Sequence, residues 1–126
     1  MNGIPEALRY LDNAKEILRD KAQKEDGRYQ DKKYVRMAGH TAYLGVLVAL
    51  DDLLGVKKKG RQSVEWYKAE LAKRDKKVTG LFDDVYNTLH LSMGYDGNLN
   101  AEVASIGLKD AEQIINWVET RLEKMQ

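Results

Sequence analysis

The pattern of apolar positions predicts helices along most of the chain, and the stretch 34–54 organises the others. From Ala42 to Leu50 every residue is apolar or glycine, so a helix here has no polar face to turn toward water. A helix that is apolar all round lies in the centre of a protein or in a membrane. Small residues recur in it every three or four positions and allow a neighbouring backbone to come close: they are Ala38, Ala42, Gly45 and Ala49.

Two local features bound each of the first two predicted helices. Pro5 suits the first position of a helix because its missing N–H is not needed there. This first helix is expected to end near Glu25, with Gly27 as its stop. Asp31 is the predicted N-cap of the second helix, and Gly55 is its predicted left-handed terminus. The connection between them is short and polar, so they are expected to be antiparallel neighbours.

A third apolar stripe runs from a cap at Ser63 to Met93. A single helix of that length would be about 45 Å long, longer than its neighbours can cover. We therefore expect it to be kinked, or split with Thr79 as a second cap, near Thr79-Gly80. A turn-rich segment follows, and Asn100 is the predicted cap of the last helix.

Four amphipathic helices with short connections predict an all-α fold, an antiparallel up-down four-helix bundle in one domain over 1–126. No stretch alternates apolar and polar residues for long, so no strand is predicted. The apolar run is shorter than a membrane span of about 20 residues and ends at Asp51-Asp52, so we expect no membrane contact and a cytoplasmic protein.

The composition excludes several kinds of chemistry but does not identify a reaction. The chain has no cysteine, which excludes disulfides, thiol catalysis and cysteine-ligated metals. It also lacks the glycine-rich phosphate-binding, zinc-protease and nucleophile-elbow motifs, so no cofactor is predicted. We therefore expect a protein that is not an enzyme.

Charge is uneven although the net charge is only +1. Residues 55–80 carry nine basic side chains against three acidic ones, whereas 81–126 carry three against eight. A basic segment can contact nucleic-acid phosphates, and it is also the ordinary composition of a solvated surface. The candidate contacts are Lys57, Lys58, Lys59, Arg61, Lys73, Arg74, Lys76 and Lys77.

Arg36 and His40 lie one helical turn apart, with Tyr43 a further turn along the same side. A histidine titrates near neutral pH, so these residues are candidates for an anion site or for general acid–base catalysis, as is His90. The alternative is that they only flank the exposed first turns of the second helix.

Asp83, Asn87 and His90 share one helical face at spacings of four and three residues. Their side chains are metal ligands by type. A di-metal bundle needs several glutamates and two Glu-x-x-His pairs, and the sequence contains no Glu-x-x-His. The alternative is a solvated polar face, and no metal is predicted.

Seven tyrosines are many for a chain of 126 residues. Aromatic side chains with a polar tip suit interfaces as well as the edges of a core. Together with the wholly apolar middle of the second helix, they predict a homodimer that associates through helix faces.

The order of elements resembles the HEPN-type four-helix bundles of bacteria and, more narrowly, a small uncharacterised family of that shape from Bacteroides-type bacteria. The segments that carry the resemblance are AKEILRDKA, YVRMAGHTAYLGVLVALDDLL and KDAEQIINWVETRLEK. Active HEPN proteins are metal-independent ribonucleases with an Arg-x(4–6)-His motif toward the last pair of helices. This chain departs from that motif, because Arg36 and His40 have three residues between them and His90 has no arginine shortly before it. The resemblance therefore implies a bundle that dimerises and has lost, or never had, ribonuclease activity.

Two functions follow as hypotheses. We favour a non-enzymatic, dimerising helical bundle that acts as an interaction or accessory module for a protein partner. The alternative is a HEPN-like, toxin-type protein that binds or cleaves RNA, with the basic segment on phosphates and Arg36 with His40, or His90, at the reaction.

Overall fold

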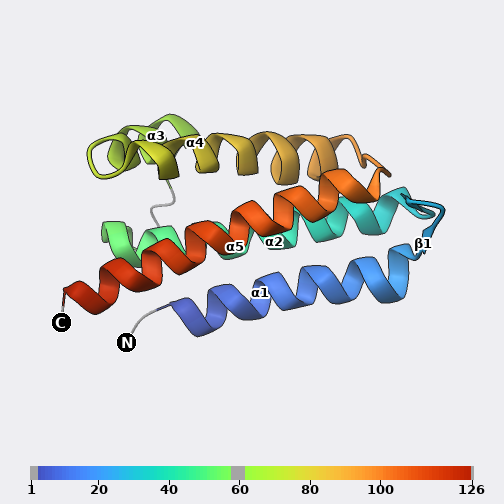
Figure 1. Ribbon diagram of the computed structural model, residues 1–126, viewed down its shortest axis with the longest axis horizontal. Coiled ribbons are helices and arrows are strands. Elements are labelled where there is room, and N and C mark those ends of the chain that lie inside the picture. The colour runs from blue at the N-terminus through green and yellow to red at the C-terminus, as the bar shows by residue number, and fades with distance from the viewer. Residues whose placement is uncertain (1–2, 58–61, 126) are drawn as a thin grey trace.

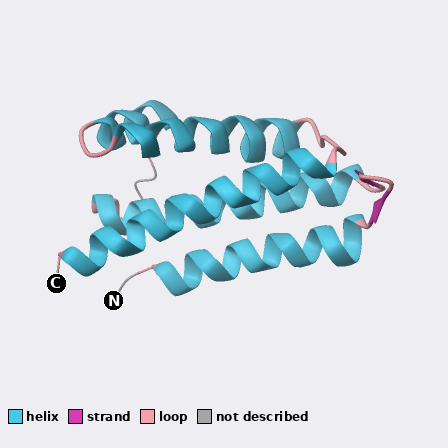
Figure 2. Cartoon of the chain, viewed as in Figure 1, coloured by secondary structure: helices cyan, strands magenta, loops and turns pink. Residues whose placement is uncertain are grey.

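The computed structural model describes residues 3–57 and 62–125, and it is all-α apart from one small hairpin (Figures 1 and 2). Five α-helices pack together, and two of them continue without a break into π-helical segments. The helical elements are α1 (Ile4–Glu16) with η1 (Ile17–Ala22), α2 (Lys32–Leu54), α3 (Val64–Ala72), α4 (Lys76–Val85) with η2 (Tyr86–Tyr95), and α5 (Ala101–Lys124). The hairpin strands are β1 (Lys24–Glu25) and β2 (Arg28–Tyr29).

Helix α2 lies at the centre and contacts α1, α5 and η2. Figure 1 shows α2 and α5 between α1 on one side and α4–η2 on the other, with α1 and α2 antiparallel as predicted. By length and composition alone, α2 would also pass as a membrane-crossing helix, the only one within the described ranges. The core helix of a soluble protein passes the same test, and half of the apolar window of α2 is buried by its neighbours.

The small residues of α2 let other backbones come close on two sides. A Cβ atom on Gly45 would lie 2.9 Å from the carbonyl oxygen of Ala7, so the predicted small-residue stripe faces α1 of the same chain. Gly39, which lies outside that stripe, faces η2, where a Cβ would be 2.5 Å from the carbonyl oxygen of Leu89. The backbone of α2 is therefore wedged between α1 and η2.

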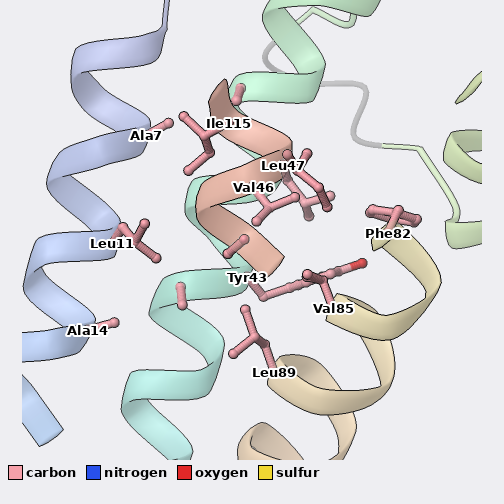
Figure 3. Close-up of a cluster of buried hydrophobic side chains, with 14 of the residues drawn as sticks. Ala7, Leu11, Ala14, Tyr43, Val46, Leu47, Phe82, Val85, Leu89 and Ile115 are labelled. Carbon is pink, nitrogen blue, oxygen red and sulfur yellow. The ribbon is translucent and has the colours of Figure 1, made fainter. Parts of the chain in front are cut away.

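One apolar cluster joins these elements (Figure 3). Ala7, Leu11 and Ala14 of α1 approach α2 from one side, and Ile115 reaches the cluster from α5. On the other side, Tyr43 extends from α2 toward Phe82 and Val85 of α4, with the ring centroids of Tyr43 and Phe82 6.3 Å apart. Tyr43 thus links the core to the surface described below.

The predicted ends of most helices are confirmed. The carboxylate of Asp31 accepts the N–H of Lys33 at 3.0 Å and caps α2. The hydroxyl of Ser63 caps α3, and the side-chain oxygen of Asn100 caps α5. Gly55 ends α2 at φ 73°, the left-handed conformation that glycine adopts without strain.

The predicted break near Thr79-Gly80 is wrong. The chain turns earlier, and α4 begins after Asp75, whose carboxylate accepts the N–H of Val78 at 3.0 Å. Thr79 lies inside α4 and donates its hydroxyl hydrogen to the carbonyl oxygen of Asp75. An aspartate is a stronger N-cap than a threonine, which explains why the helix begins after Asp75 and not after Thr79. The third predicted helix is therefore two helices, and α3 packs against α4.

The end of the first helix also differs from the prediction. Helical structure stops at Ala22, and the next residues form a hairpin in which Lys24 pairs with Tyr29 and Glu25 with Arg28. The two loop residues, Asp26 and Gly27, have φ values of 51° and 77°. An Asp-Gly pair in this conformation is the preferred two-residue hairpin turn, so the prediction of no strand is wrong here.

Candidate histidine–tyrosine site

The fold brings His90 beside Arg36 and His40, the pair that helical spacing already placed together. His40 of α2 and His90 of η2 have ring centroids 5.5 Å apart. Arg36, one turn before His40, donates from Nε to the carbonyl oxygen of Tyr95 at 3.1 Å. The candidate catalytic residues therefore form one surface where α2 crosses η2.

Three tyrosines complete what we call the histidine–tyrosine cluster, formed by His40, Tyr43, Tyr86, His90 and Tyr95. The ring centroid of His90 lies 4.8 Å from that of Tyr43, 5.1 Å from that of Tyr86 and 5.3 Å from that of Tyr95. The Tyr86 and His90 rings are stacked, whereas Tyr95 meets both histidines edge-on. His90 is thus enclosed by aromatic rings from two elements.

The π-helical form of η2 explains why Tyr95 belongs to the cluster. In an α-helix, Tyr95 would lie about 140° around the axis from His90. In η2 the backbone bonds join residues five apart, as in the 3.0 Å bond from the N–H of Asp96 to the carbonyl of Leu91. The wider turn brings Tyr95 back to the side of His90. Sequence periodicity at helical spacing could not have found this residue.

Two glycines provide the space that the cluster occupies. A Cβ on Gly94 would lie 2.6 Å from Cε1 and 2.8 Å from Nδ1 of His40, so the His40 ring occupies the space that the missing side chain leaves. On the opposite helix, a Cβ on Gly39 would lie 2.9 Å from the backbone nitrogen of Gly94. This pair of glycines was the available sequence signal for the site, because it allows α2 and η2 to touch at His40.

The two imidazoles have different surroundings. His40 is exposed, whereas His90 is half-buried and its Nδ1 is buried without a hydrogen-bond partner within the described ranges. Burial, and secondarily the charge of His40, lower the pKa of His90 below its ordinary 6.5. His90 is therefore neutral at pH 7.

We expect the pKa of His90, measured by NMR titration, to lie below 6.5 and to rise only part of the way back in a His40→Asn variant, because burial is the larger cause. Below pH 6.5 the His90 side chain of the unfolded chain is protonated more fully than that of the folded chain. The free energy of unfolding is therefore expected to fall as the pH drops through 6.5. Arg36, Tyr43, Tyr86 and Tyr95 are the other charged or titratable groups nearby. A His90 pKa at or above 6.5 would contradict the enclosed geometry.

A cavity of about 440 Å³ continues from the cluster toward the start of α3. Its wall includes His40 and His90 at one end, Leu44 and Leu47 of α2 in the middle, and Tyr67 of α3 at the other end. The hydroxyl of Tyr67 donates to the carboxylate of Asp51 at the end of α2, which holds α3 beside the cavity. The lining is mainly apolar, so this space suits a side chain of a partner better than a polar substrate.

The other candidate ligands and contacts are not gathered at the cluster. Asp83 accepts from Nζ of Lys68 at 3.0 Å, and Asn87 is exposed. Within residues 3–57 and 62–125, no group of three or more His, Asp or Glu side chains is arranged to hold a metal.

The basic segment divides into two parts. Lys57 is exposed, whereas Lys58, Lys59 and Arg61 lie outside the described residues. Lys73 and Arg74 both bind the carboxylate of Glu70, and Lys76 and Lys77 are exposed in the first turn of α4. His90 follows Lys77 by thirteen positions along continuous helix, a distance of about 20 Å along the axis. The 73–77 turn is therefore remote from the histidine pair.

Comparisons with known proteins identify a family without a known activity. The model of the family described as domain of unknown function (DUF5618) matches residues 2–120, and the chain belongs to that family. A solved structure of a protein of unknown function from Dyadobacter fermentans is 57% identical, covers 95% of each chain and superposes with a TM-score of 0.89. None of the curated proteins matches the chain. The resemblance to a small uncharacterised family is confirmed.

Proposed function

We propose that this member of the DUF5618 family is a non-enzymatic, homodimeric accessory module of the cytoplasm that self-associates through one surface. We call this surface the α2–η2 face and define it by Met37, His40, Leu44, Tyr86, His90 and Tyr95. The main observation that supports this proposal is that exposed apolar side chains surround the histidine–tyrosine cluster. We further propose that α1–η1, α2, α4–η2 and α5 act as the four members of an up-down bundle, with α3 added at its side.

Five large hydrophobic side chains are exposed among the described residues, and three of them lie on this face, whereas Ile106 and Met125 lie elsewhere. Met37 is 44% exposed, Leu44 36% and Tyr95 63%. Met37, His40 and Leu44 follow one another along α2 at helical spacing, and Tyr95 lies beside His40. Met and aromatic residues are enriched in the centres of protein interfaces. Exposed apolar side chains that lie this near one another support a protein-binding surface.

The charge of the face favours a second copy of the same chain as its occupant. At its centre, the lowered pKa of His90 keeps that ring neutral at pH 7. Arg36 lies at the edge, where its guanidinium is bound to the carbonyl of Tyr95. A two-fold contact sets each residue against the same surface of the partner, so a charged centre would repel itself. The α2–η2 face as defined contains no Asp, Glu, Lys or Arg, so this repulsion is small.

Light scattering coupled to size exclusion tests the proposal on the unmodified chain. At micromolar concentration and pH 7.5, we expect a mass twice the 14.4 kDa of one chain. A single 14.4 kDa species at every concentration up to a few hundred micromolar would contradict self-association.

A HEPN-like protein that binds or cleaves RNA is the second candidate, supported by the adjacency of Arg36, His40 and His90. Two neighbouring imidazoles in different surroundings suit a general acid and a general base, and an arginine suits a phosphate. This candidate predicts RNA binding that weakens steeply with salt, and RNA cleavage that His40→Ala abolishes without unfolding the chain. Absence of RNA binding at 20 mM salt would exclude it. The separation of the 73–77 turn from His90 counts against it.

A further inference from the structure

A groove that shares no lining residue with the α2–η2 face lies between the η1 end of the first helix, the hairpin and α5. It encloses about 670 Å³, within the range of small-molecule sites. Its floor is apolar and includes Leu18 of η1, which is 3% exposed, and Leu108 of α5, which is half-buried. Tyr29 of β2 also lines it, and burial raises the pKa of the Tyr29 hydroxyl, so the ring stays uncharged.

The hairpin is a fixed wall of this groove. The N–H of Tyr29 donates to the carbonyl of Leu99 at 2.8 Å, and the N–H of Ala101 donates to the carbonyl of Gly27 at 3.0 Å. These two backbone bonds join the hairpin to the beginning of α5. These main-chain contacts fix the position of the hairpin, so the groove is already formed before a ligand binds.

The rim of the groove is positively charged. Lys15, Arg19, Lys24 and Lys109 line it, against one carboxylate, that of Glu112. Arg19 is paired with Asp20, whereas Lys15, Lys24 and Lys109 form no ion pair within the part of the chain that the structure describes. Three unpaired ammonium groups around an apolar floor are complementary to an anion with an apolar body.

We propose that this groove binds a small, soluble anionic amphiphile, a carboxylate or phosphate monoester carrying an aliphatic or aromatic group. The apolar group lies on Leu18, Leu108 and the Tyr29 ring, and the anion lies among Lys15, Lys24 and Lys109. Charge fixes the orientation of the ligand, and apolar contact supplies most of the affinity. This groove is distinct from the α2–η2 face, so the ligand proposal can be tested independently of dimerisation.

Calorimetry with decyl phosphate below its micelle-forming concentration tests the proposal, with decanol and inorganic phosphate as the two partial ligands. Decyl phosphate is expected to bind at least ten-fold more tightly than either. If inorganic phosphate bound as tightly as decyl phosphate, the groove would recognise charge alone. If decanol did, the groove would recognise apolar groups alone. Either result overturns the proposal. So does binding to anionic lipid vesicles without binding of free decyl phosphate.

Two matched pairs of variants locate the binding. Ser105→Trp fills the groove from an exposed position and is expected to weaken decyl phosphate at least ten-fold, whereas Ile106→Trp adds the same ring beside the groove and changes binding less than two-fold. Lys24→Gln is expected to weaken binding about three-fold or more, and Lys21→Gln, outside the lining, to leave it unchanged. Circular dichroism verifies the fold of all four variants. Unchanged binding by folded Ser105→Trp would place the ligand elsewhere.

Discussion

Replacing Gly39 with alanine is expected to lower the free energy of unfolding by about 3 kcal/mol, because overpacking of a rigid contact leaves no space for a methyl group. The new Cβ would lie 2.5 Å from the carbonyl oxygen of Leu89, 2.7 Å from Cβ of Met93 and 2.9 Å from the nitrogen of Gly94. Two of these are backbone atoms, so no side-chain rotation relieves the overlap and α2 must separate from η2. Urea unfolding followed by circular dichroism measures the effect as a fall in the midpoint of more than about 1 M.

Gly80→Ala is the matched control, because Gly80 lies inside α4 and nothing is within 4 Å of the position that its Cβ would take. Alanine is a better helix former than glycine by about 1 kcal/mol, so this variant is expected to be more stable than the parent chain. If Gly39→Ala were as stable as the parent, α2 and η2 would not be in contact, and the geometry of the histidine–tyrosine cluster would be wrong.

Leu44→Glu is expected to convert the proposed dimer into a folded monomer. Leu44 is 36% exposed on the α2–η2 face, so a carboxylate there is tolerated by the single chain. In the dimer the same group would be removed from water without a partner, with a second carboxylate near it across the two-fold axis. We expect the dissociation constant to rise about 100-fold, equivalent to about 2.7 kcal/mol, as measured by analytical ultracentrifugation.

Ile106→Glu controls for the loss of any exposed hydrophobic side chain. Ile106 is 51% exposed on α5 and lies outside the α2–η2 face. This variant is expected to remain dimeric with an unchanged dissociation constant. Equal weakening by both substitutions would show that association does not depend on the α2–η2 face.

Local signals in the sequence predict most helix ends, because they act within a few residues. Asp31, Ser63 and Asn100 each cap the helix that follows, as their residue types predict. The break between α3 and α4 was harder to place, because Asp75 and Thr79 are both possible caps. The Asp26-Gly27 pair carried the signal for a hairpin, but its strands have only two residues each, too few to show alternation.

The candidate site was predictable only in part. Arg36 and His40 are neighbours on one helix, so their proximity follows from helical spacing. The meeting of His40 with His90 depends on how α2 crosses η2, which no local pattern determines. Tyr95 joins the cluster through the π-helical turn, a departure from the regular period on which the sequence interpretation relies.

Helix α2 connects these observations, because its apolar surface is only partly buried in the core. Gly45 and Gly39 let the backbones of α1 and η2 pack directly against α2. Most of the apolar surface of α2 is covered by these contacts. Met37 and Leu44 remain outside that core. We propose that Met37 and Leu44 are covered by the same residues of a second chain.

The most direct measurement is an isotope-filtered NOE spectrum of a dimer assembled from labelled and unlabelled chains, which detects only contacts between copies. The α2–η2 interface predicts intermolecular cross-peaks from the methyl groups of Met37 and Leu44 and from the ring of Tyr95. Cross-peaks confined to other surfaces, such as the methyl groups of Ile106, would contradict it.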